Sequence, residues 1–424
     1  MLKKAARKVV VVISWFLVRL YIRKYKPIII GVTGSVGKTG TKRSIAHILS
    51  SERSVMWQNG NYNDLVTVPL IFFGLDAPSL FNPFAWVLTY IKMVISIILG
   101  KGTDTVVLEL GTDGPGQIAQ FGKYLTLDIA VVTAISHEHM AFFGTLDAVA
   151  NEELAVRTYA KKVYIADTIV KDRYVTKEQL EQGIYEVYGS ESSSKVRFMV
   201  KSDDLQIITS KFELVATPQI IGAHQYAALA IAAEIAATLG ISKDSIESAI
   251  ATLSGMPGRM NKLEGKDNSI LIDDSYNASP VAVREALQYL YALPQKRKIA
   301  VLGNMNEMGE LSKELHSSLA SYCDPKKLTM LITIGTDINK YLPPLLENTG
   351  MKVITMDNPY EIGEFLGNMN LTNTAILFKG SQNGVFLEES IKPILSNRND
   401  HKFLVRQSNE WMKKKESQFG RHPV

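Results

Sequence analysis

The chain has 424 residues, of which 46% are hydrophobic and 21% are charged, so it is a folded protein with room for two domains. Its single cysteine, Cys323, excludes an internal disulfide and fits a reducing cytoplasm. The net charge of +5 arises in residues 1–26, which hold eight Lys or Arg and no acidic residue. The rest has 39 basic and 42 acidic residues, which argues against nucleic acid as a partner.

Residues 1–26 predict a helix with an apolar body and basic flanks. Its apolar stretch, residues 9–18, has about half of the ~20 residues that a membrane-spanning helix needs. No small-residue cleavage site follows, so we interpret the segment as retained rather than as a signal peptide. Two interpretations stay open: a peripheral contact with the inner face of the cell membrane, or packing on the protein's own body. We expect the rest of the chain to fold without it.

A β-branched strand, a glycine-rich loop and a helix follow from residue 27. This order is typical of a phosphate-binding loop, in which backbone N–H groups and the start of the helix face the phosphates. Lys38 is predicted to reach the β- and γ-phosphates of ATP, and the Thr39 hydroxyl to bind Mg²⁺. The alternative is a chance match, because the first glycine is one position from its usual place. The predicted loop comprises Gly34, Ser35, Val36, Gly37, Lys38, Thr39 and Gly40.

The remaining pattern predicts an α/β fold. Strands alternate with helices up to residue 166, an antiparallel excursion covers residues 196–216, and a helix is expected over residues 224–239. Gly and Pro cluster near residue 255, and a second alternation of strands and helices follows. We therefore predict a basic apolar helix at 1–26, a P-loop domain with a mainly parallel sheet at 27–255, and a Rossmann-like α/β domain at 256–424.

Two further segments are predicted from their composition. Residues 84–99 are apolar or aromatic apart from Thr89, Lys92 and Ser96, which favours a buried or surface-docked helix. The alternative is a membrane-facing patch that these residues form together with residues 9–18. The basic tail, residues 401–424, is expected to fray.

The loop variant G-x-T-G-x-x-G-K-T and seven later segments in order resemble the Mur ligase family over almost the whole chain beyond residue 27. These segments are QNGNYNDLVTVPL, VLELGTDGPGQI, HMAFFGTLDAVA, PGRM, DDSYNASP, VLGNMNEMGELSKELH and KGSQNGVFLE. The resemblance implies that a carboxylate attacks the γ-phosphate of ATP and that an amine then displaces phosphate from the acyl phosphate. It also implies a departure, since the family's separate domain for UDP-linked substrates has no counterpart here.

The resemblance implies roles for several residues. Glu109 is expected to ligate Mg²⁺ beside Thr39, and His139 to ligate a second Mg²⁺. Glu153 stands where most relatives carry a carbamylated lysine, so we infer that its carboxylate replaces the carbamate as a metal ligand. The alternative is an ordinary acid on a solvated helix face beside Glu152.

In the second domain the resemblance gives Arg259 a phosphate contact and Asp274 a contact to the ribose of the nucleotide. Both are expected to close over ATP as the domains approach, and the alternative for both is a structural role in the hinge.

We therefore predict an ATP- and Mg²⁺-dependent amide ligase that adds D-Ala-D-Ala, or a similar dipeptide-like amine, to the carboxylate of a cell-wall precursor. One alternative keeps the chemistry but takes a lipid-linked or poly-amino-acid acceptor. The other is a scaffold that binds ATP without forming bonds.

Overall fold

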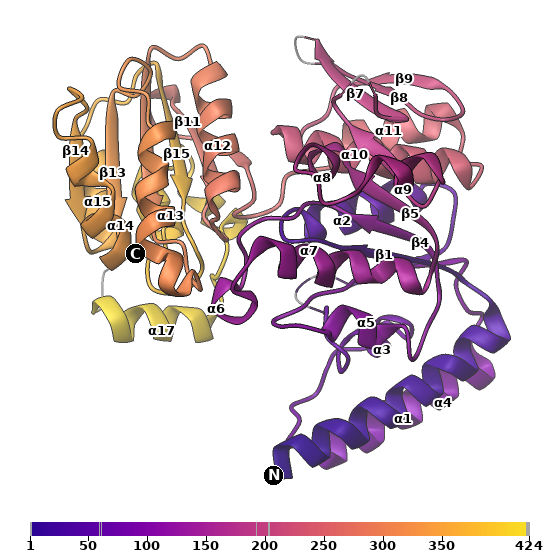
Figure 1. Ribbon diagram of the computed structural model, residues 1–424. Helices are drawn as coiled ribbons and strands as arrows, with labels where there is room; N and C mark the ends of the chain where they lie inside the picture. Colours follow the sequence, from indigo (N-terminus) through magenta and orange to yellow (C-terminus); the bar gives the residue numbers. More distant parts are fainter. Residues whose placement is uncertain (1, 59, 61, 192, 202–203, 421–424) are drawn as a thin grey trace. The chain divides into compact units, whose positions relative to one another are not determined.

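The structure is a computed structural model that describes residues 2–420 except 59, 61, 192 and 202–203. The chain divides into two compact units, each built on its own sheet (Figure 1). Unit 1 comprises Met1–Ser136, Phe142–Pro218 and His224–Leu253. Unit 2 comprises His137–Ala141, Gln219–Ala223 and Ser254–Val424.

Unit 1 contains a nine-stranded sheet in the order β2-β3-β1-β4-β5-β6-β7-β8-β9. Its strands are parallel from β2 to β7, and β7, β8 and β9 pair antiparallel, as predicted. The strands are β1 (Ile28–Thr33), β2 (Val55–Met56), β3 (Thr105–Glu109), β4 (Leu127–Val132), β5 (Ala160–Ala166), β6 (Glu186–Gly189), β7 (Val196–Lys201), β8 (Asp204–Ile208) and β9 (Glu213–Ala216).

Strand β1 lies between β3 and β4, at the point where the strand order reverses direction. It pairs in parallel with both neighbours and is almost entirely buried, which explains its β-branched, apolar sequence. In open α/β sheets, ligands bind outside the carboxyl ends of the strands at such a reversal. The fold therefore places the glycine-rich loop at the expected ligand-binding edge.

Helices lie on both faces of this sheet (Figure 1). One of them, α10, is buried around most of its circumference, which fits its Ala-rich sequence. The helices of unit 1 are α1 (Leu2–Tyr25), α2 (Lys38–Leu49), α3 (Val68–Ile71), α4 (Pro83–Leu99), α5 (Gln117–Phe121), α7 (Leu146–Leu154), α8 (Asp167–Lys171), α9 (Lys177–Glu181), α10 (Ala223–Thr238) and α11 (Lys243–Thr252), with α6 (Met140–Phe143) at the edge of the unit.

Helix α1 packs on unit 1 through one face. Trp15 is 1% exposed, donates from its indole nitrogen to the Leu65 carbonyl oxygen at 2.9 Å, and stacks on Tyr124 with ring centroids 5.0 Å apart. Val18 and Tyr21 are also buried. Because these side chains complete the core, the packing argues against our expectation that the rest of the chain folds without residues 1–26.

Helix α4 lies beside α1, and the two helices run in the same direction (Figure 1). The Tyr25 hydroxyl lies 2.8 Å from the carbonyl oxygen of Gly100, and the Lys24 ammonium donates to that of Ile97 at 2.6 Å. Helix α4 begins after Asn82, whose side chain accepts from the Ala85 backbone N–H at 3.0 Å. The prediction of a surface-docked helix over residues 84–99 is confirmed. No described helix is both long enough and apolar enough to cross a bilayer.

Unit 2 contains a six-stranded sheet in the order β10-β11-β15-β12-β13-β14, with only the β10–β11 pair antiparallel. This confirms the predicted fold class: a mainly parallel P-loop unit followed by a second α/β unit. The strands are β10 (Asn261–Glu264), β11 (Ile270–Asp274), β12 (Arg297–Gly303), β13 (Met330–Ile334), β14 (Val353–Met356) and β15 (Thr374–Lys379). The helices are α12 (Pro280–Ala292), α13 (Ser312–Ser318), α14 (Thr336–Tyr341), α15 (Pro359–Gly367), α16 (Glu388–Ile391) and α17 (Asn409–Phe419).

The expected fraying of the basic tail is wrong for residues 409–419, which form helix α17. Lys415 of this helix is fully buried, with its ammonium 2.8 Å from a Glu388 carboxylate oxygen and 2.6 Å from one of Glu389. The aliphatic part of a lysine side chain can be buried when its ammonium is paired with a carboxylate. The basic composition of the tail therefore did not prevent α17 from packing on unit 2. The last four residues, 421–424, lie outside the described part of the chain.

Candidate active site

The loop that follows β1 requires glycine at two positions. Gly34 has a φ of +121°, and a Cβ atom there would lie 2.4 Å from the Thr133 hydroxyl oxygen. Gly37 has a φ of +89° directly before α2. Such backbone conformations cost other residues free energy, so the two glycines allow the tight turn that leads into the helix.

The loop is anchored to the segment after β4. The backbone N–H of Ser35 donates to the Ala134 carbonyl oxygen at 2.8 Å, and the Ser35 hydroxyl oxygen accepts from the Ser136 N–H at 3.0 Å. The Thr133 hydroxyl donates to the Val36 carbonyl oxygen at 2.6 Å. These bonds hold the loop between two strand ends, as a preorganised phosphate site requires.

Lys38 and Thr39 begin helix α2 at this loop. The Lys38 ammonium donates to the carbonyl oxygen of Gly34, so its charge lies over the loop itself. The Thr39 hydroxyl donates to a carboxylate oxygen of Glu109 at 3.2 Å. Gly40 is in the first turn of α2, and no other atom lies within 4 Å of the Cβ position there. The predicted loop residues therefore come together at one strand end.

Glu109 ends strand β3 and is buried against a lysine. Lys42, which is 0% exposed, places its ammonium 2.9 Å from Oε2 of Glu109. The Lys42 ammonium is thus the cationic partner of this buried carboxylate. The other oxygen of Glu109 accepts from the Thr39 hydroxyl, so two oxygen donors of the kind that Mg²⁺ prefers lie side by side.

Glu153 lies under the same loop, at the end of α7. It is 2% exposed, accepts from the Gly34 N–H at 2.9 Å, and also accepts from the Thr33 hydroxyl. The alternative of a solvated helix-face acid is therefore wrong. Its neighbour Glu152 is buried too but faces elsewhere, accepting from the N–H of Ile118 at 2.7 Å at the start of α5.

His139, by contrast, groups with unit 2. It has a φ of +51°, and its Nδ1 atom lies 2.6 Å from a carboxylate oxygen of Glu307. Its Nε2 atom lies 3.7 Å from Glu138. The structure thus shows an imidazole oriented by carboxylates, and its role as a metal ligand stays a prediction.

Arg259 and Asp274 also belong to unit 2. The Arg259 guanidinium lies over the ring of Tyr276, 4.1 Å from its centroid. Asp274, at the end of β11, accepts from the Met260 N–H at 3.1 Å and pairs with the Lys379 ammonium at 2.7 Å. Both side chains are held in defined positions, and their contacts with a nucleotide stay predictions.

Three residues of the site were missed from the sequence: Lys42, Thr33 and Thr133. Lys42 had a signal, because it occupies a position of the apolar stripe of α2 that continues with Ile45 and Leu49. A lysine there implies a buried anionic partner. Thr33 had a signal too, because it is the first threonine of the G-x-T-G-x-x-G-K-T loop variant. Thr133 had none, because threonine is common in strands and at their ends.

No group of three or more His, Cys, Asp or Glu side chains arranged to hold a metal ion is found within residues 2–420 as described. Mg²⁺ in nucleotide enzymes is usually held by one or two protein oxygens together with phosphate oxygens. Thr39 and Glu109 fit that smaller donor set.

Comparison with known proteins gives a consistent result. The Mur ligase middle domain matches residues 32–236, and the Mur ligase glutamate ligase domain matches residues 258–382. The UDP-N-acetylmuramoyl-tripeptide–D-alanyl-D-alanine ligase of Bacillus subtilis is 24% identical over 89% of this chain and 78% of its own length. The enzyme of the same name from Rickettsia prowazekii is 26% identical over 85% and 77%.

A solved structure shows the same fold. The MurF ligase from Thermotoga maritima, crystallised with ADP, superposes with a TM-score of 0.71 at 23% identity, over 90% of this chain and 83% of its own. The two domain matches follow one another along most of the chain and coincide with its two α/β units. The chain therefore belongs to the Mur ligase family of ATP-dependent carbon–nitrogen ligases.

Proposed function

We propose that this chain joins D-alanyl-D-alanine, or a similar dipeptide amine, to a carboxylate of a UDP-muramoyl peptide precursor of the cell wall, using ATP and Mg²⁺. The relatives named for this reaction match over most of the chain. The observation that carries the proposal is the buried Glu109 carboxylate, which pairs with Lys42 and accepts from Thr39, beside a preorganised phosphate loop.

The reaction proceeds in two displacements. A carboxylate oxygen of the precursor attacks the γ-phosphorus of ATP, ADP leaves, and an acyl phosphate forms. The amine nitrogen then attacks the acyl carbon, phosphate leaves, and the nitrogen loses a proton to give the amide. The backbone N–H groups of the loop and the Lys38 ammonium stabilise the negative charge on the phosphoryl oxygens.

Mg²⁺, when bound, would neutralise the β- and γ-phosphate oxygens in the first displacement. Thr39 and Glu109 are the residues proposed to hold it, and Glu153 is proposed as a ligand of a second ion. In the same proposal His139 is a further metal ligand, Arg259 contacts phosphate, and Asp274 contacts the ribose.

A substrate-dependence assay tests the proposal. Phosphate release from ATP is measured with the UDP-muramoyl tripeptide alone, with D-alanyl-D-alanine alone, and with both. We expect turnover only with both substrates. Turnover that needs the dipeptide but accepts a lipid-linked or poly-amino-acid carboxylate in place of the UDP precursor would favour the alternative acceptor. Tight ATP binding without turnover on any pair would favour a scaffold.

The proposal includes a location for the enzyme. The basic helix at residues 1–26 is proposed to hold it at the inner face of the cell membrane.

A further inference from the structure

The pair of helices α1 and α4 exposes a large apolar surface. It supplies 13 of the 20 large hydrophobic side chains that are exposed in the described part of the chain. Phe84 is 85% exposed and Leu99 77%, while Phe16 of α1 is 58% exposed. Single exposed apolar residues are common, but 13 of them on two adjacent helices mark a surface that a membrane or another protein covers.

The charge around this face has one sign. Residues 1–26 and 77–103 contain no Asp or Glu, and between them they hold ten Lys or Arg. Amphipathic helices with an apolar face and basic borders lie in the plane of an anionic bilayer, with the apolar side chains among the acyl chains. This charge complementarity favours a lipid surface over a second copy of the chain, because two copies would bring cations together.

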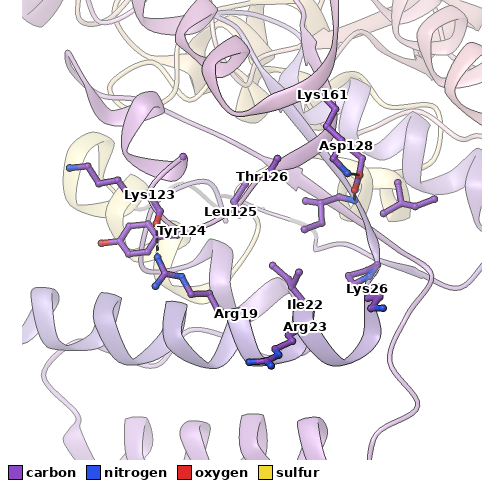
Figure 2. Close-up of a pocket in the computed structure, with 14 residues that line it drawn as sticks. Arg19, Ile22, Arg23, Lys26, Lys123, Tyr124, Leu125, Thr126, Asp128 and Lys161 are labelled. Carbon is purple, nitrogen blue, oxygen red and sulfur yellow. Dashed lines mark hydrogen bonds and ion pairs between the residues drawn. The ribbon is translucent and has the colours of Figure 1, made fainter.

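A basic hollow lies beside α1, next to this face. It has a volume of about 580 Å³ and is lined by Arg19 and Arg23 of α1, and by Lys26, Lys123 and Lys161 (Figure 2). Asp128 is the acidic side chain that lines it. Arg19 and Arg23 each follow an exposed apolar residue of α1 by three positions, Phe16 and Leu20, so they border the apolar face.

The hollow is built by the fold rather than by flexible side chains alone. The Arg19 guanidinium donates to the Lys123 carbonyl oxygen at 2.6 Å and lies 5.8 Å from the ring centroid of Tyr124. Asp128 accepts from the Ile29 N–H at 2.9 Å and from the Lys161 ammonium at 2.7 Å. A guanidinium group held as that of Arg19 is matches the geometry of phosphate oxygens.

We propose that the exposed face of α1 and α4 docks on a bilayer containing anionic phospholipid, and that the adjacent hollow takes the phosphate of a lipid headgroup. The apolar face supplies insertion into the acyl region, and the cations supply selectivity for anionic lipid. Docking is measured as binding of the protein to vesicles. This measurement does not depend on whether the protein catalyses the proposed ligase reaction.

The experiment measures co-sedimentation of the full chain with vesicles. One set contains equal parts of phosphatidylglycerol and phosphatidylcholine, and the other contains phosphatidylcholine only. We expect binding to the first set and little to the second. Ile91→Glu with Ile95→Glu should weaken binding by about a hundredfold, since both side chains are half exposed on the face. Val200→Glu with Val215→Glu, exposed on the β7–β9 excursion, is the matched control and should bind normally.

The hollow is tested with paired charge removals. Arg19→Gln with Arg23→Gln should weaken binding about fivefold for each charge removed. Lys171→Gln with Lys177→Gln removes the same charge from α8 and α9, at the far end of unit 1 from α1, and should have little effect (Figure 1). Soluble glycerol phosphate carries the same phosphate group, so an excess of it should compete for the hollow and weaken the binding of the wild type to vesicles.

Several results would overturn the proposal. Face variants that bind like the wild type would refute the docking surface. Equal loss from both charge pairs, or vesicle binding that an excess of glycerol phosphate leaves unchanged, would refute a headgroup site. Light scattering tests self-association. If the wild type is a dimer that does not bind vesicles, and the face variants are monomers, the face is a contact between two copies of the chain. Circular dichroism of each variant confirms that it is folded.

Discussion

In folded proteins charged side chains are usually exposed and large apolar side chains are usually buried. Two regions of unit 1 depart from this pattern in opposite ways. Under the phosphate loop, the charged side chains of Lys42, Glu109 and Glu153 are almost fully buried. On α1 and α4, large apolar side chains face solvent. Each arrangement costs stability, so neither is what folding alone would select.

The difference lies in where the compensation comes from. Under the loop it comes from within the chain, because Lys42 pairs with Glu109 and the Gly34 N–H binds Glu153. On the exposed face of α1 and α4 the compensation has to come from a partner outside the chain, which we propose is a bilayer. A buried charge with its partners thus marks a site for chemistry, and an uncovered apolar face marks a site for docking.

The largest expected effect tests whether the loop region acts on phosphate. Lys38→Ala should lower ATP turnover by on the order of a thousandfold or more, because the ammonium would no longer offset charge on the phosphoryl oxygens. The midpoint of thermal unfolding should hardly change, since the Lys38 ammonium donates to carbonyl oxygens of Gly34 and Ser35 in its own loop rather than packing in the core. Near-normal phosphate release would refute the assignment of the loop.

The next prediction asks whether the buried charges compensate each other. Lys42→Met should lower the free energy of unfolding by about 3 kcal/mol, because Glu109 would remain buried without its cation. Urea denaturation measures this. The double variant Lys42→Met with Glu109→Gln should recover much of the loss. If it is no more stable than the single variant, the ion pair is not the cause.

A third prediction separates the two adjacent glutamates of α7. Glu153→Gln should lower Mg²⁺-dependent turnover about a hundredfold, because it removes a carboxylate proposed to bind metal. Added bicarbonate should not affect the wild type, since Glu153 needs no carbamylation. Activation by bicarbonate would point to a lysine elsewhere in the site.

Glu152→Gln is the matched control. Glu152 accepts backbone N–H bonds at the start of α5, so its variant should lose about 1–3 kcal/mol of stability and keep its turnover per folded molecule. Equal and mild losses of turnover in both variants would refute a metal role for Glu153.

The smallest effect concerns a buried group outside both regions. His316 in unit 2 accepts from the Met305 N–H at 3.0 Å, and burial lowers its pKa below the usual 6.5. The unfolded chain therefore binds the proton more readily, so stability is present above about pH 6.5 and falls as the pH drops below it. Urea denaturation at about pH 7.5 and about pH 5.5 should show this difference. It should shrink in His316→Gln, and an unchanged difference would exclude His316 as its source.

The sequence by itself determined the elements whose signals are local. A β-branched strand, two glycines needed for positive φ, and the Lys38–Thr39 pair together specify the β1–loop–α2 unit. The order of strands and helices likewise predicted two α/β units, because hydrophobic periodicity acts over a few residues.

Only the tertiary structure decided which side chains are buried and with what partners. Glu153 meets Gly34 across 119 residues of sequence, and Lys42 meets Glu109 across 67. The same was true of the tail, which we expected to fray, because pairing with Glu388 buries Lys415. Residues 84–99 were predicted as a helix, but only their packing beside α1 left one face uncovered. The free energy of a buried charge or an exposed apolar surface depends on what lies across from it, and sequence spacing does not report that.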